Sequence, residues 1–261
     1  MRVRRRRGFL ALASVLAALF GLSPIDAAQA RARAQPAPDP VIVVAGTGAA
    51  EPAIPALDLT LLVDRLAADG YTAFVFYLPG QGLGDIGTTS AAFAPFVDQV
   101  LATTGASRVD VVGHSQGGLV ARYYIKFLGG EPKVDSFVGL ATPHQGTALA
   151  NLASLHGLVD CVGYTFCQQV VTGSSWLAAL NGDDDTFGAV RYTNFATTLD
   201  LIVVPYTNSF QRSPGAVNVV VQQRCPLHVV EHLTLALDGT TYSGVQDALA
   251  GRPVTLNCLA L

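Results

Sequence analysis

The sequence has little charge, and positive charge is especially scarce outside its N-terminus. Only 13% of the 261 residues are charged. The first thirty residues hold five of the 16 basic residues and one of the 19 acidic ones, which leaves 11 basic against 18 acidic residues and a net charge of −7. Nucleic acids and anionic membranes repel a surface of this sign. We therefore expect neither as a stable partner.

The N-terminus lacks an apolar run long enough to span a membrane. Gly8–Leu22 gives fifteen apolar or small residues, where a spanning helix needs about 20. The run follows five arginines in Met1–Arg7 and precedes Ala28-Gln29-Ala30, which has the A-x-A form of a cleavage site. Residues 1–30 are therefore predicted to be a signal peptide, and the protein to be secreted. Arg6–Leu10 also suits a twin-arginine signal, so Sec and Tat export both stay open.

The remainder shows no repeat and no internal linker. Residues 31–40 form an Ala/Pro-rich leader without core residues, and residues 41–261 suit one compact catalytic domain with a large core. We expect this domain to be a monomer.

Cysteine is scarce, and all four cysteines lie in the exported part of the chain, at Cys161, Cys167, Cys225 and Cys258. An even number in an oxidising compartment predicts two disulfides. Three pairings are possible, and proximity in sequence favours Cys161–Cys167 with Cys225–Cys258. Paired C-x-x-C ligands are absent, so a metal site is not expected.

The glycine-rich segment Ala45–Ala50 also lacks the features of a nucleotide site. It has neither the Lys-Ser/Thr ending of a P-loop nor the third glycine of the dinucleotide fingerprint. No organic cofactor is implied.

What the chain does have is an alternation of strand and helix patterns. Strands are predicted at 41–45, 73–78, 108–112, 134–140, 190–197 and 216–221, and helices at 55–69, 91–104, 119–127, 172–180 and 242–250. Such alternation predicts an α/β fold, with a mostly parallel sheet covered by helices on both faces. In sheets of this kind the functional residues gather at the carboxyl ends of the strands.

The pentapeptide Gly113-His114-Ser115-Gln116-Gly117 lies where a strand pattern changes into a helix pattern. A G-x-S-x-G turn in this place holds the serine hydroxyl exposed at a helix N-terminus, where an oxyanion is stabilised. A chain of this composition contains the pentapeptide by chance roughly 0.1 times. Because the strand, the turn and the helix occur in the required order, we predict that Ser115 is a nucleophile rather than part of an ordinary glycine turn.

A serine nucleophile needs a histidine base and a carboxylate that orients it, in the chain order serine, acid, histidine. His114 lies inside the turn and is expected to pack or to hydrogen-bond. His144 comes too early in the order, and His156 lies in an irregular segment. His228 and His232 both follow the last predicted strand, so the order alone leaves both open as the base.

The acid is expected in a loop that follows a strand. Asp200 is in this position, between "VRYTNFATT" and "LIVVP". The run Asp183–Asp185 is expected to be a solvated turn, Asp160 precedes the first cysteine, and Asp238 follows both histidines. The order and the loop position therefore favour Asp200.

Two backbone donors are needed to bind the oxyanion. One is expected to be the N–H of Gln116, directly after the nucleophile. The other usually comes from the loop after the first strand, where Thr47 follows the glycine that turns the chain.

Four segments together resemble the secreted actinobacterial lipases of the class 2 type, which have the α/β-hydrolase fold. They are "LGDIGTTSAAFAPFVDQVLATTGASRVDVVGHSQGGLVARYYIKFLGG", "ATPHQGT", "LDLIVVPYTNS" and "CPLHVVEHLTLALD". The resemblance extends from about Pro40 to the C-terminus. One departure is Ala45-Gly46, where the family has His-Gly.

The resemblance implies a full set of site residues. These are the triad Ser115, Asp200 and His232, the oxyanion donors Thr47 and Gln116, and the disulfides Cys161–Cys167 and Cys225–Cys258.

Together these features predict a secreted serine carboxylic-ester hydrolase, a lipase or esterase without metal or cofactor, whose contact with lipid interfaces is at most transient. A polyester depolymerase, an acyltransferase and a catalytically silent binding module are the alternatives. Leu152–Val159 is expected to be either a cap element over an acyl groove or core. The chain between 140 and 189 is too short for a large separate lid domain, and we expect medium or long acyl esters to be preferred.

Overall fold

The computed structural model describes residues 38–49, 59–148, 150 and 163–261. Their strands form one six-stranded sheet in the order β2-β1-β3-β4-β5-β6, and every pair of neighbours is parallel. The strands are β1 Val41–Val44, β2 Ala73–Phe76, β3 Val109–His114, β4 Val134–Leu140, β5 Arg191–Ala196 and β6 Ala216–Val220. The predicted α/β fold with a parallel sheet is confirmed.

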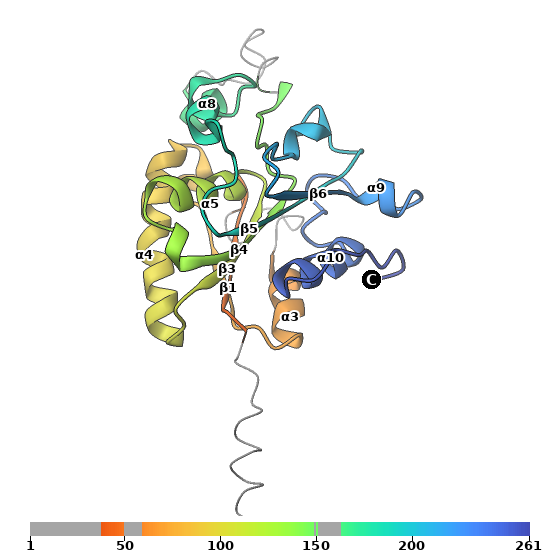
Figure 1. Ribbon diagram of the computed structural model, residues 1–261. Helices are drawn as coiled ribbons and strands as arrows, with labels where there is room; N and C mark the ends of the chain where they lie inside the picture. Colours follow the sequence, from red (N-terminus) through yellow and green to blue (C-terminus); the bar gives the residue numbers. More distant parts are fainter. Residues whose placement is uncertain (1–37, 50–58, 149, 151–162) are drawn as a thin grey trace, which may run out of the picture. The chain divides into compact units, whose positions relative to one another are not determined.

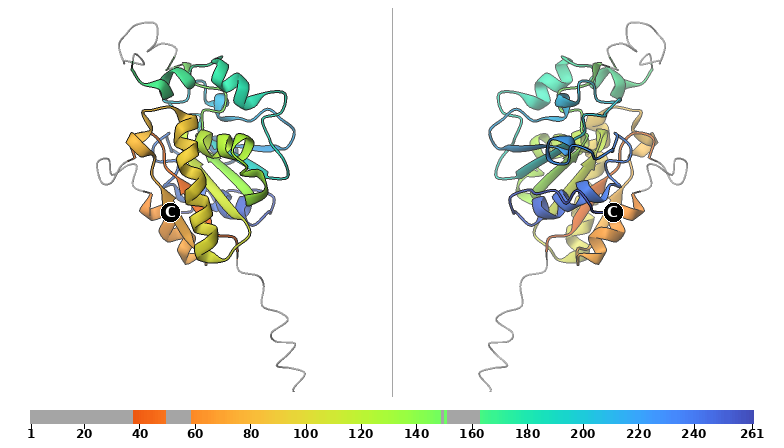
Figure 2. Two further views of the ribbon diagram at one scale, coloured as in Figure 1. Left: turned by 90° about the vertical axis from the view of Figure 1, so that its left-hand side faces the viewer. Right: turned by 90° about the vertical axis from the view of Figure 1, so that its right-hand side faces the viewer.

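Helices cover both faces of this sheet (Figure 1). On one face lie α4 Ile86–Thr104 and α5 Gln116–Phe127, and on the other lie α3 Thr60–Ala68 and α10 Gly239–Leu249. Figure 2 shows α4 across the first face in one view and α10 across the second face in the other. The shorter helices are α7 Thr165–Gln169, α8 Ser175–Asn181 and α9 Val221–Arg224, with 3-10 turns η2 Pro79–Gly82, η3 Glu131–Lys133 and η4 Tyr206–Ser209.

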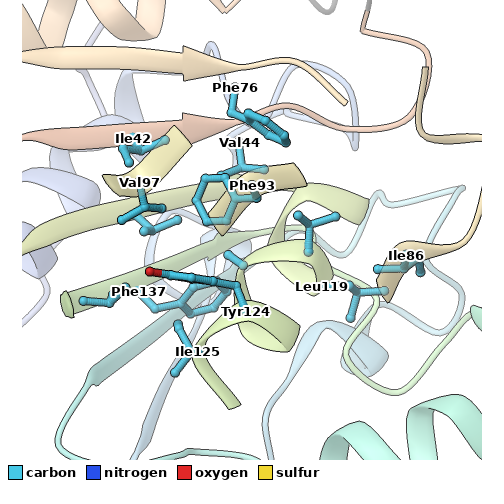
Figure 3. Packing of buried hydrophobic residues seen from close by; sticks show 14 of the residues in the cluster. Ile42, Val44, Phe76, Ile86, Phe93, Val97, Leu119, Tyr124, Ile125 and Phe137 are labelled. Carbon is cyan, nitrogen blue, oxygen red and sulfur yellow. The ribbon is translucent and has the colours of Figure 1, made fainter. Parts of the chain in front are cut away.

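Each face of the sheet has its own apolar core. Between the sheet and α4 and α5, Phe93 packs edge-on against Tyr124, with ring centroids 5.3 Å apart, and tilted against Phe76 at 5.1 Å (Figure 3). The core on the other face joins strand residues to Leu66 of α3 and Val245 of α10. Alternate residues of β1 belong to opposite cores, and β1 is a continuous apolar run, as burial on both faces requires.

The predicted boundaries fit some elements better than others. β4 spans the predicted residues, whereas α4 begins five residues before the predicted Ala91. The Asp85 side chain caps this helix by accepting from the Thr88 N–H at 2.6 Å, and such a cap fixes a helix start independently of apolar periodicity. Similarly, the Ser174 side chain caps α8 by accepting from the Leu177 N–H. Most of the helix predicted at 55–69 before Thr60 lies outside the described residues.

The Cys225–Cys258 disulfide is present, with Cα atoms 5.5 Å apart, and this predicted pairing is confirmed. Cys167 is disulfide-bonded, but Cys161 lies outside the described residues, so its pairing with Cys167 stays a prediction. The same holds for the cap role of Leu152–Val159 and for the absence of a large lid. Within the described part of the chain, no helix combines the length and the apolar character that crossing a membrane requires.

Candidate active site

Ser115 stands at the junction of β3 and α5 in a backbone conformation that few residues other than glycine adopt. Its φ is 52° and its ψ −125°. Its N–H donates to the carbonyl of Leu140, at the end of the neighbouring strand β4, at 2.8 Å. Such a strained conformation persists only where the surrounding structure holds it, and it projects the side chain out of the turn.

Glycines allow the turn to close. A Cβ on Gly113 would lie 2.6 Å from the Cα of Gly118, and a Cβ on Gly117 would clash with the carbonyl oxygens of Val44 and Ala45. The first turn of α5 therefore packs directly on the end of β1. Substitution of either glycine would push the helix N-terminus away from the strand ends.

His232 and Asp200 complete a chain of hydrogen bonds with Ser115. The Ser115 hydroxyl lies 3.0 Å from Nε2 of His232, and Nδ1 of the same ring lies 2.9 Å and 3.1 Å from the Asp200 carboxylate oxygens. The side chains of His232 and Asp200 are 3% and 1% exposed. The structure thus brings together the three residues proposed as a triad, from the loops that follow β3, β5 and β6.

The Asp200 carboxylate is held by backbone donors. Its Oδ1 accepts from the N–H groups of Ile202 and Val203 at 2.8 and 2.7 Å. These bonds fix the orientation of the carboxylate toward the imidazole. The Thr197 hydroxyl donates to the carbonyl of Val230 at 2.7 Å, which ties the loop of the acid to the loop of the base.

His114, the last residue of β3, contacts both the backbone and the ring of His232. Its Nε2–H donates to the carbonyl of His232 at 2.9 Å, and the two rings are 5.3 Å apart. Burial, with the nearby His232 as the next cause, lowers the pKa of His114 to about 4. The ring is therefore neutral at physiological pH, and it is a buried hydrogen-bonding residue, as the sequence suggested.

Thr47 and Gln116 lie together beside the serine. A Cβ on Gly46 would lie 3.1 Å from the Ser115 Cβ, so the backbone before Thr47 abuts the nucleophile. Gln116 is the first residue of α5, and an N–H in this place has no acceptor within its own helix. Ala45, at the family's histidine position, is fully buried, and its N–H donates to the carbonyl of Phe76.

The side chain of Gln116 has a second role that the sequence did not reveal. Its Oε1 accepts from the Thr47 hydroxyl at 2.5 Å, and its Nε2 donates to the carbonyl of Gly82 at 2.9 Å. The buried carboxamide therefore links the loop after β1 to η2. A buried glutamine directly after a G-x-S motif gives no sequence signal for this role, because both partners are distant in the chain.

His228 is occupied by a different carboxylate. Its Nε2 lies 2.6 Å from Oδ1 of Asp238, and Asp238 also caps α10 by accepting from the Thr241 N–H. Nδ1 of His228 lies 3.5 Å from the Thr240 hydroxyl. The structure therefore brings His232, and not His228, to Ser115.

His144 belongs to a buried polar network that includes Arg122 of α5. Arg122 donates to its Nδ1 at 3.1 Å, and its Nε2–H donates to Oδ1 of Asn194 at 2.8 Å. Burial, followed by the charge of Arg122, holds the pKa of His144 well below its usual value. This imidazole is a structural group, and His156 lies outside the described residues.

The expectation of a solvated turn at Asp183–Asp185 is wrong for its last residue. Asp183 and Asp184 are exposed, but Asp185 is only 6% exposed. Its carboxylate accepts from the N–H groups of Arg212 and Ser213 and from the Gln145 side chain. A run of three aspartates looks solvated in sequence because these partners are distant in the chain.

Comparisons with known proteins agree with this fold. Residues 39–163 match the α/β hydrolase fold family. A triacylglycerol lipase from Pseudarthrobacter phenanthrenivorans is 35% identical over 109 residues, which cover 40% of this chain and 33% of that lipase. Lipase B from Pseudozyma antarctica is 28% identical over 201 residues, which cover 74% of this chain and 56% of that protein. The matches thus span between about a third and about half of the lengths of these curated relatives.

Solved structures show the same architecture. Aspergillus fumigatus lipase B superposes with a TM-score of 0.68 at 19% identity, covering 86% of this chain and 55% of that one. The mature form of a Bacillus licheniformis lipase gives 0.61 at 19% identity, covering 82% and 93%. The chain therefore has the α/β-hydrolase fold and has lipases among its relatives.

Proposed function

We propose that this chain, an α/β hydrolase by fold, is a secreted serine carboxylic-ester hydrolase that cleaves lipid acyl esters through an acyl-enzyme on Ser115. The observation that carries the proposal is the continuous line of hydrogen bonds from the Ser115 hydroxyl through His232 to Asp200. Nothing in this chemistry requires a metal or an organic cofactor.

The first half of the reaction forms the acyl-enzyme. The Ser115 Oγ attacks the ester carbonyl carbon while Nε2 of His232 takes the hydroxyl proton. Asp200 accepts the Nδ1–H bond, which fixes the tautomer that leaves Nε2 free to act as a base. The carbonyl oxygen becomes an oxyanion, and we assign its stabilisation to the backbone N–H groups of Gln116 and Thr47. Collapse breaks the bond to the alcohol oxygen, which takes from His232 the proton that came from Ser115 and leaves as the alcohol.

The second half releases the acid. Water takes the place of the alcohol, His232 removes its proton, and the resulting hydroxide attacks the acyl carbon. Collapse of this second tetrahedral species breaks the bond to Ser115 and returns the proton to its Oγ. The product is a carboxylic acid, and the site is restored.

A lipid substrate is supported by apolar side chains on the loops that bear Asp200 and His232. Leu201 beside Asp200 is 79% exposed, and Leu227 and Val229 just before His232 are 96% and 82% exposed. Exposed apolar residues concentrated on functional loops favour an apolar ligand. The names of the lipase relatives point to the same class, and we propose medium or long acyl chains.

Secretion is supported by the arginine-rich and apolar N-terminal run and by the Cys225–Cys258 disulfide, since such bonds persist in oxidising compartments. We accordingly propose that residues 1–30 are removed on export, that residues 31–40 are a leader, and that residues 41–261 form the catalytic domain. Within the α/β hydrolases, we place the protein with the secreted class 2 lipases on the motifs described above.

Hydrolysis of p-nitrophenyl esters from acetate to palmitate tests this function. The wild type should hydrolyse the medium and long esters best, and Ser115→Ala should lower kcat by a factor of about 10⁶. Ser107→Ala is the matched control, because Ser107 is an exposed residue before the opposite end of β3. A steep optimum at acetate would make this a short-chain esterase, and full activity in Ser115→Ala would refute the serine mechanism.

A further inference from the structure

Three carboxylates meet at the amino-terminal ends of the strands, the end of the sheet opposite to Ser115. Asp39 lies two residues before β1, while Asp110 and Asp135 are the second residues of β3 and β4. Ser115 follows the carboxyl end of β3, so this cluster is at the other end of the same strand. The cluster therefore brings the segment before β1 next to β3 and β4, the two central strands of the sheet.

The spacing of the carboxylates suits a shared cation. One oxygen from each of Asp39, Asp110 and Asp135 lies within 4.8 Å of the others. Calcium binds carboxylate oxygens at about 2.3–2.6 Å, so two oxygens on the same ion are at most about 5 Å apart. The three side chains therefore need no large rearrangement to bind one ion.

Asp110 supplies the independent sign that something binds there. It is 97% buried, since only 3% of its surface is exposed, and its Oδ1 has no hydrogen-bond partner among the described residues. Ser136, which pairs with Asp110 across the sheet, has a buried hydroxyl that likewise lacks a partner there. Two such oxygens on adjacent strands are costly to bury unless a proton or a cation satisfies them.

The charges around the cluster compensate one carboxylate more than the others. Arg108 and Arg191 contact the two oxygens of Asp135 at 2.6 and 2.7 Å. Burial, with the charges of Asp135 and Asp39 as further causes and Arg191 opposing them, raises the pKa of Asp110 to about 8. Among the described residues no arginine or lysine forms an ion pair with the Asp110 carboxylate, and a cation would provide a positive partner.

We propose that Asp39, Asp110 and Asp135 form a calcium site that fastens the start of β1 to β3 and β4. Asp39 and Asp135 are only partly buried, so the ion enters from solvent, and water fills the remaining coordination positions. Each Asp135 oxygen has two lone pairs, so it can bind the ion while it keeps its arginine. The site acts on stability and takes no part in ester hydrolysis.

Thermal unfolding of EDTA-treated protein with and without 10 mM CaCl₂, at matched ionic strength, tests the site. For a Kd near 1 mM, the unfolding temperature of the wild type should rise by about 2–4 °C. Asp110→Asn should abolish this rise, and Asp64→Asn, which removes the same charge from the exposed side of α3, should keep it. Asp39→Asn provides a second site variant if Asp110→Asn does not fold. No shift in the wild type, or an undiminished shift in a site variant, would overturn the proposal.

Discussion

Two histidines that lie four residues apart, His228 and His232, each contact an aspartate, and the two pairs differ in which ring nitrogen meets the carboxylate. His232 uses Nδ1 for Asp200, which leaves Nε2 for the Ser115 hydroxyl at 3.0 Å. His228 uses Nε2 for Asp238 at 2.6 Å. Both pairs are short and well formed, so the presence of a His–Asp contact does not by itself identify a base.

The surroundings of the two pairs explain the difference. The Asp200 carboxylate is 1% exposed and held by two backbone donors, whereas the side chains of His228 and Asp238 are 20% and 13% exposed. Asp238 is the cap of α10, so His228 adds to a helix start. We infer that one pair orients a base and that the other secures the chain beside the Cys225–Cys258 bridge.

The strongest test of this comparison removes each imidazole in turn. His232→Ala should lower kcat for a medium-chain ester by a factor of about 10⁴–10⁶, because the serine loses its base. His228→Ala should keep kcat within a few-fold and cost at most about 1 kcal/mol of stability, as expected of a partly exposed pair. Steady-state kinetics and urea unfolding on both variants measure this. Reversed effects would mean that the two histidines have been assigned the wrong way round.

The same contrast should hold for the carboxylates. Asp200→Asn should lower kcat by about 10⁴, because an amide at this position no longer fixes the imidazole in the productive tautomer. Asp238→Asn should leave kcat nearly unchanged, since asparagine caps helices about as well as aspartate. Equal kinetic losses in the two variants would show that Asp238 also serves the site.

The disulfide tests the structural role of the second pair. Replacing Cys225 and Cys258 together by serine should lower the free energy of unfolding by about 4 kcal/mol, from the entropy of a loop of 34 residues. The kcat at 25 °C should fall less than about tenfold, because Thr197 and Asp200 hold the His232 loop independently. Urea unfolding and kinetics on the folded variant measure the two effects. A loss of activity without a loss of stability would contradict this division of roles.

The smallest expected effect concerns His114, which packs against His232. Its pKa of about 4 in the folded protein lies below its usual value of 6.5, so the folded state resists protonation and stability is lost as pH falls from 6.5 toward 4. This loss should amount to about 2 kcal/mol between pH 7 and pH 4.5. His114→Gln, which retains a donor for the His232 carbonyl but does not titrate, should lose about 2 kcal/mol less over that interval. Urea unfolding at the two pH values decides, and an unchanged pH dependence in the variant would refute the assignment.

Much of the fold could be predicted because its signals are local. The strand β1 is four consecutive apolar residues, all buried, and the G-x-S-x-G turn indicates both the end of β3 and the start of α5. The start of α4 was missed because the Asp85 cap, rather than apolar spacing, sets it.

The rest depends on contacts between residues far apart in the chain. His228 and His232 are equivalent in chain order, and the partners that distinguish them are Asp238 and Asp200, on opposite sides of the pair in sequence. The burial of Asp185 depends in the same way on Arg212 and Ser213. Such pairings follow from the folded sheet and its loops, and a single sequence does not contain them.

The central claim is that Ser115 is a nucleophile activated by His232. Labelling with a fluorophosphonate, followed by mass-spectrometric mapping of the modified residue, tests it directly in the wild type, His228→Ala and His232→Ala. We predict modification at Ser115 alone, at the same rate in the wild type and His228→Ala, and at least about 10³-fold slower in His232→Ala. Modification of another residue, or rapid labelling that survives in His232→Ala and is lost in His228→Ala, would contradict the account.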